Sequence, residues 1–188
     1  MYLLGGFREA LALTKEGEDR ARLRGVQRTS GAILMSNMIE PLFALGEWDA
    51  AEEFLERALE LEPPLGFSAH LQRIKLWSTL WRGRLPEAER LLRAWRTPLW
   101  LQQRIDAQVR LGFARVAGEI ELESGNPSWA EVRAVIDDDH RGLPAYDLPL
   151  LMVAARVLAS VIAGCGTVDL DTTAAESQLR TALTRDSR

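Results

Sequence analysis

Apolar side chains recur along most of the chain at the spacing of one face of an α-helix. One such run steps by three or four residues: Leu101, Ile105, Val109, Phe113, Val116 and Ile120. That spacing places the side chains in a single stripe on a helix of 3.6 residues per turn. No convincing run alternates β-branched and polar residues as a strand would. The pattern therefore predicts an all-α fold.

The same spacing, interrupted by prolines and glycines, predicts about nine helices. We expect them to span about residues 6–24, 27–45, 49–61, 67–82, 86–96, 99–124, 128–138, 147–163 and 171–184. Prolines at 63, 64, 98, 127 and 144 fall between these segments, where a missing N–H costs little. Asp49 and Asp171 are expected as N-caps, and Pro86 as the first helical residue. The pattern defines the fold least well between residues 140 and 170.

A short motif of glycine, a large apolar residue and alanine repeats along the chain. It appears as Gly46, Trp48 and Ala51, and related copies follow glycines 5, 83 and 125. These four glycines are 41, 37 and 42 residues apart. A glycine at a helix end adopts the left-handed backbone of a tight turn without strain, and a small alanine lets two helices pack closely.

Helix pairs of this kind leave one apolar face open, and a neighbouring pair has to cover it. The repeats therefore predict one domain built as a superhelical array of antiparallel helix pairs. The expected units are about 1–25, 27–64, 67–97, 99–140 and 145–188. Such a domain makes contacts rather than catalysing a reaction.

Composition limits the classes of partner and compartment. The net charge is −4 and the sequence pI about 5.3, so a direct nucleic-acid surface is not expected. The single cysteine, Cys165, excludes an internal disulfide and fits a reducing compartment. The first residues give no reason to expect a secretory signal. Its most apolar segment, Asp147 to Ala163, is too short to span a bilayer and includes Arg156. We expect a cytoplasmic protein with no membrane contact.

The sequence gives only weak support for catalytic or metal-binding groups. Residues 137–140 read Asp-Asp-Asp-His, which is more typical of an exposed helix end than of a metal loop with spaced ligands. His70 and His140 have no partner ligand at zinc spacing. Cys165 lies in a predicted turn between two glycines with no apparent base nearby. We therefore expect no enzyme activity, cofactor or metal.

Six residues are candidates for recognition. Trp77 and Trp81 share one helix face, and either pack between repeats or anchor a ligand in the concave groove. Arg73 is placed on the same helix, with Lys75, as a polar contact. The remaining candidates are Arg28, Asn37 and Glu40, which belong to the first helix of a pair. A neighbouring basic run, Arg20 to Arg28, lies beside acidic residues at 16, 18 and 19 and is expected to form solvated ion pairs.

The expected unit at about 27–64 resembles a tetratricopeptide (TPR) unit. Six residues occupy the expected second-half positions: Gly46, Trp48, Ala51, Leu55, Ala58 and Pro63. The first half departs from the pattern, with methionines at 35 and 38 and Ile39, and the period exceeds the roughly 34 residues of a standard repeat. With residues 6–13 and 42–52, these departures resemble the longer repeats of LuxR-type large ATP-binding transcriptional regulators.

This resemblance implies a bacterial sensor domain. In that family an ATPase module precedes the repeats and a helix-turn-helix module follows them, and the sequence contains neither motif. The resemblance implies that the repeats bind a protein partner or small effector in the concave groove and relay that event to the flanking modules. Pairing of two copies through exposed array ends is a further expectation. The alternative is a free-standing scaffold or oligomerisation module without a role in transcription.

Overall fold

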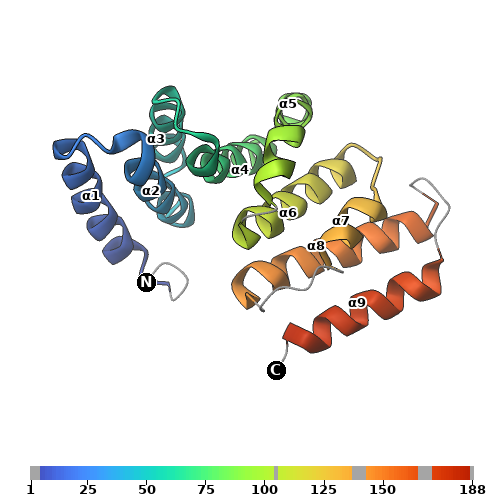
Figure 1. Cartoon of the computed structure of the whole chain (residues 1–188). Helices are drawn as coiled ribbons and strands as arrows, with labels where there is room; N and C mark the ends of the chain where they lie inside the picture. The colour runs from blue at the N-terminus through green and yellow to red at the C-terminus, as the bar shows by residue number, and fades with distance from the viewer. Residues whose placement is uncertain (1–4, 104–105, 137–142, 165–170, 187–188) are drawn as a thin grey trace. The chain divides into compact units, whose positions relative to one another are not determined.

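The computed structural model describes residues 5–103, 106–136, 143–164 and 171–186. All regular elements in these ranges are helical, which confirms the all-α prediction. Figure 1 labels the α-helices. Within the described ranges there are nine α-helices and one π-helical turn, η2. They are α1 (Phe7–Leu23), η2 (Gln27–Gly31), α2 (Ala32–Ala44), α3 (Trp48–Glu60), α4 (Leu65–Trp81), α5 (Leu85–Gln103), α6 (Ala107–Glu123), α7 (Trp129–Ile136), α8 (Pro144–Ile162) and α9 (Thr172–Asp186).

The chain divides into two compact units, Met1–Arg82 and Gly83–Arg188. In the first unit, α2 is the central helix and packs against α1, α3 and α4. Its apolar core joins the α2 side chains of Ile39 and Leu42 to Leu55 from α3 and Leu71 from α4. The side chains of Ile39 and Leu55 have no exposed surface. Burial of these apolar groups holds the unit together.

In the second unit, α6 and α8 form the main contact, and α5, α7 and α9 pack beside them. The core includes Leu111 from α6, Val132 from α7, Leu150 and Val157 from α8, and Leu179 from α9. Two small residues face this contact, since Ala154 has no exposed surface and a side chain added at Gly118 would meet Val153. α2 packs against α4 in the first unit, and α6 packs against α8 in the second.

Glycines end the first helix of each hairpin. Gly46, Gly83 and Gly125 have φ angles of 80°, 73° and 74°, as predicted, and Gly164 follows with 84°. At the α2–α3 corner, the N–H of Gly46 donates to the Phe43 carbonyl, and the next N–H donates to the Leu42 carbonyl. This pair of hydrogen bonds is the Schellman motif, which satisfies the last carbonyls of a helix. The repeated glycines therefore mark equivalent corners.

Replacing Gly46 tests the conformational role of these corners. A Cβ added there meets no atom within 4 Å, so any cost comes from the backbone conformation and not from crowding. We expect Gly46→Ala to lower the free energy of unfolding by about 1–2 kcal/mol. Gly46→Asn should cost less, because asparagine tolerates left-handed backbone. Urea denaturation followed by circular dichroism measures both, and equal stability of the alanine variant and the parent would contradict this reading.

The predicted boundary at Pro98 is wrong. α5 runs through Pro98 to Gln103, so residues 99–103 belong to α5 and not to the following helix. The next helix instead begins after Asp106, whose carboxylate accepts hydrogen bonds from the N–H groups of Gln108 and Val109 at 2.9 and 3.2 Å. This capping pattern satisfies the free donors of a helix N-terminus. The expected unit limits at 97 and 99 shift accordingly, and Leu101 lies on a different helix from Val109.

Three further predictions concern helix starts: one is confirmed, one is wrong, and one segment begins with a π-helical turn that was not predicted. Asp171 caps α9, because its carboxylate accepts a hydrogen bond from the Ala174 N–H at 3.0 Å. Asp49 is not an N-cap, since α3 begins at Trp48 and places it in the first turn. The segment predicted to start at 27 begins as the π-helical turn η2, in which the Gly31 N–H donates to the Val26 carbonyl. Residues 137–140 and Cys165 lie outside the described residues.

Helix α8 is longer than predicted. It starts at Pro144, the first helical residue, where a proline fits because that N–H has no partner in the helix. At 19 residues and a mean hydropathy of 1.6, α8 is long and apolar enough to cross a membrane, which corrects the expectation that this segment is too short. Of its apolar window, 44% is buried in the protein, and buried core helices pass the same test.

Candidate interaction site between α2, α3 and α4

An aromatic cluster joins α4 to the α2–α3 hairpin. The Phe43 ring meets the rings of Trp48 and Trp77 edge to face, with centroids 5.3 and 5.4 Å apart. The Trp81 ring stacks on Trp48 at 6.0 Å and lies 3.9 Å from the Trp77 ring. Aromatic pairs in such geometries contribute about 0.5–1.5 kcal/mol each beyond their burial. Trp77 and Trp81 therefore lie together, as their spacing of four residues predicted.

One turn earlier on α4, Arg73 forms an ion pair with Glu40 of α2. The two side chains are 18% and 19% exposed, so water screens the pair only partly. Three contacts thus follow one another along the border of α4, and we name them the α2–α4 ladder. They are Glu40–Arg73, Phe43–Trp77 and Trp48–Trp81.

The outer end of the ladder is open and charged. The Trp81 side chain is among the exposed large apolar groups, with 48% of its surface accessible. Arg82 lies over the Trp48 ring at 5.4 Å and forms ion pairs with Asp49 and Glu52. An exposed tryptophan beside an arginine combines the two residue types most often found at binding hot spots.

Two donors within the ladder are buried and have no hydrogen-bond partner among the described residues. They are the indole Nε1 of Trp77 and the Nε of Arg73. A buried donor left without an acceptor costs about 1–3 kcal/mol. Buried donors without an acceptor are uncommon in folded proteins, so each one calls for a physical explanation.

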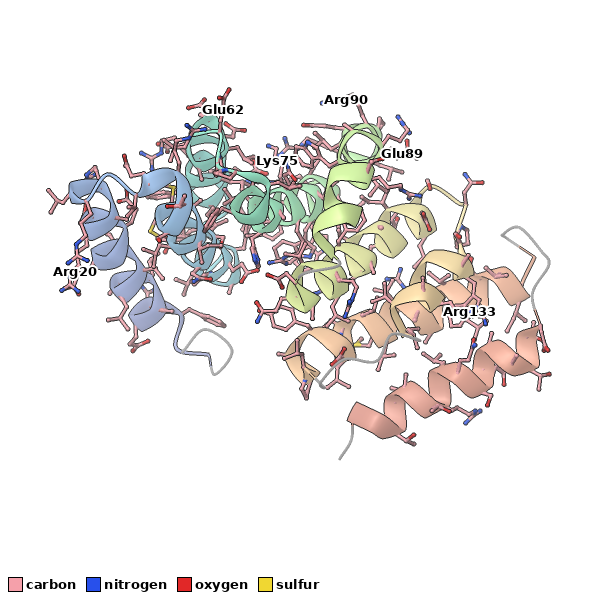
Figure 2. The ribbon with its side chains drawn as sticks, in the orientation of Figure 1. Arg20, Glu62, Lys75, Glu89, Arg90 and Arg133 are labelled. Atoms are coloured by element: carbon pink, nitrogen blue, oxygen red, sulfur yellow. The ribbon has the colours of Figure 1, made fainter. Side chains whose placement is uncertain are left out.

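The other predicted recognition residues lie apart from this cluster. Asn37 is exposed on α2, three residues before Glu40. Arg28 donates a hydrogen bond of 2.7 Å to the carbonyl of Glu62, just after the end of α3. Glu62 is labelled in Figure 2, and its φ of 48° is the one positive value at a described non-glycine residue. Arg28 therefore holds a corner of the fold.

Lys75, predicted as a polar contact, points elsewhere. Lys75, which is labelled in Figure 2, pairs with Glu56 of α3 at 3.3 Å. Its side chain is only 12% exposed. Trp95 and Trp100 both lie within α5. The basic run on α1 forms local ion pairs, Arg20 with Glu16 and Arg22 with Asp19, as predicted. Sequence reasoning did not single out Phe43 and Trp48 as partners of the two α4 tryptophans.

The geometry suits binding. No three His, Cys, Asp or Glu side chains converge on a metal position within the described ranges. The site offers an aromatic surface bordered by paired charges, carried on rigid helices. The class that this fold defines is an all-α protein. Family models, curated proteins and solved structures contain no match to the chain.

Proposed function

We propose that this chain is a TPR-like helical repeat domain of a LuxR-type bacterial transcriptional regulator. In this proposal its hairpins continue into a superhelix, and the protein acts in the cytoplasm. It binds a partner protein or effector and relays that binding to flanking ATPase and DNA-binding modules. The supporting features are the helix ends at glycines, at spacings longer than a standard TPR, and the resemblance of about residues 5–64 to that family.

The observation that carries a binding role is the exposed end of the α2–α4 ladder. A partner that covers Trp81 removes a large apolar surface from water, which is favourable by about 25 cal/mol per Å². Arg82 beside it supplies charge for orientation. Hot spots of this composition contribute most of the binding energy of many interfaces.

The same ladder provides a route for relay. Its contacts join α4 to the α2–α3 hairpin, so a ligand held by it acts on the angle between consecutive hairpins. A ligand shifts such an equilibrium only if it prefers one arrangement. A partner that gives Trp77 Nε1 or Arg73 Nε an acceptor would favour the arrangement in which those donors are reachable.

The test has two parts. The complete reading frame should encode a phosphate-loop ATPase before residue 1 and a helix-turn-helix module after residue 188. A frame with neither favours the free-standing scaffold and removes the transcriptional proposal. The second part measures binding of the purified chain to the separately purified flanking modules by isothermal titration calorimetry.

In that measurement, Trp81→Ala should weaken binding at least about tenfold, because an anchor tryptophan contributes more than about 1.4 kcal/mol. Leu23→Ala is the matched control. Leu23 is 86% exposed on α1 and lies outside the ladder, so its replacement should leave the affinity unchanged. If Trp81→Ala binds as tightly as the control, the ladder is not the binding surface.

A further inference from the structure

A cavity of about 350 Å³ lies among α1, α2 and α3 of the first unit. Its apolar lining consists of Met35, Met38, Phe54 and Leu61. No residue of the α2–α4 ladder lines it. On a helix with 100° per residue, Met35 and Met38 lie opposite the α2 face that carries Asn37 and Glu40. The cavity is therefore a second site, separate from the one in the proposed function.

The volume of this cavity and the methionine side chains that line it suit a small molecule. Ligand pockets in proteins usually enclose about 300–1,000 Å³ and are lined mainly by apolar side chains. The two methionine side chains are 7% and 2% exposed, so this part of the lining is largely shielded from solvent. Methionine is unbranched and polarisable, which lets it adjust to ligands of irregular shape.

Charged groups surround the apolar lining. Lys15, Glu18, Asp19 and Arg22 of α1 and Arg57 of α3 all border the cavity. Arg22 is paired with Asp19, and the Arg57 guanidinium lies 4.3 Å from the centre of the Phe54 ring. Within the described part of the chain, Lys15, Glu18 and Arg57 form no ion pair. Among these three groups, two are cations, Lys15 and Arg57, and one is an anion, Glu18.

We propose that this cavity binds a small amphipathic carboxylate. The apolar body of the ligand lies on Met35, Met38 and Phe54, and its carboxylate meets Lys15 and Arg57. An arginine can bind a carboxylate through two parallel N–H donors, and charge-assisted hydrogen bonds of this kind are roughly twice as strong as neutral ones. The positive excess at the rim favours an acid over an amine of the same shape.

Such a ligand would connect helices that otherwise meet mainly through α2. α1 and α3 each pack on α2, and both contribute residues to the cavity lining. A molecule between them adds contacts to both. The bound state therefore holds α1 more firmly in the unit.

Methionine methyl signals in NMR test the location directly. Sodium decanoate is titrated into the full chain labelled with ¹³C at the methionine methyl groups. Met35 and Met38 should shift together, while Met152, which is 71% exposed on α8 in the other unit, should not. The absence of shifts at Met35 and Met38 up to millimolar decanoate, or shifts largest at Met152, would overturn the proposal.

Charge variants test the recognition of the carboxylate. Lys15→Gln and Arg57→Gln should each weaken decanoate binding about tenfold and leave the binding of neutral decanol unchanged. Arg20→Gln is the matched control, because Arg20 pairs with Glu16 on α1, does not line the cavity and projects away from the other helices (Figure 2). An equal loss for decanoate and decanol, or an equal loss in the control, would refute the assigned charge contacts.

Discussion

We expect Gly118→Val to lower the free energy of unfolding of the second unit by about 3 kcal/mol, the upper end of the usual cost of overpacking a core. Gly118 lies on α6 where this helix contacts α8. A Cβ added there would come within 2.9 Å of Val153 Cγ1, closer than real side chains approach, and within 3.6 Å of Val132 Cγ2. Valine side chains are stiff and this site is buried, so neither neighbour can move aside cheaply. The better helix propensity of valine recovers only a few tenths of a kcal/mol.

Urea denaturation of the full chain, followed by circular dichroism, measures this loss. Ala155→Val is the matched control, because Ala155 lies on the exposed side of α8 and added methyl groups there meet water. A double variant, Gly118→Ala with Val153→Ala, should be more stable than the sum of its single changes predicts. Unchanged stability of Gly118→Val would mean that α6 and α8 do not pack as described.

The second large effect is expected at Leu55. This α3 side chain has no exposed surface and lies in the core of the first unit with Ile39 and Leu71. Leu55→Ala removes buried methyl groups and leaves a cavity, which typically costs about 2–5 kcal/mol. The midpoint of thermal or urea denaturation should fall accordingly.

The same substitution at an exposed leucine is the control. Leu13 on α1 is 54% exposed, so Leu13→Ala should change stability by no more than about 0.5 kcal/mol. The difference between the two variants isolates the contribution of burial, since the chemical change is identical. Comparable losses at both positions would be inconsistent with the core of the first unit as described.

The corners of the fold could be predicted because their causes are local. Gly46, Gly83 and Gly125 each adopt a positive φ, and the residues next to each glycine were enough to predict it. The boundary at Pro98 failed for the opposite reason. A proline disfavours a helix interior but does not forbid it, and the cap at Asp106 placed the helix start later. The start of the following helix is thus set by the Asp106 cap, which the spacing of apolar residues does not reveal.

The sites were less accessible from the sequence, because they depend on contacts between helices. The pair Trp77 and Trp81 was visible from its spacing within α4. Its partners Phe43 and Trp48 come from other helices, and nothing local assigns them. The cavity was not predicted at all, since Lys15 and Arg57 are 42 residues apart and meet its rim only after α1 and α3 have packed on α2. The unusual methionines at 35 and 38 were its only signal.

The contact order of this fold has a consequence for how fast it forms. In both units the principal packing partners are helices adjacent in the chain or separated by one helix, such as α2 with α4. Closing the short loops between such neighbours costs little chain entropy. Proteins dominated by near-neighbour contacts reach the native state in microseconds to milliseconds. Each hairpin can thus nucleate as it leaves the ribosome, before the rest of the chain has been synthesised.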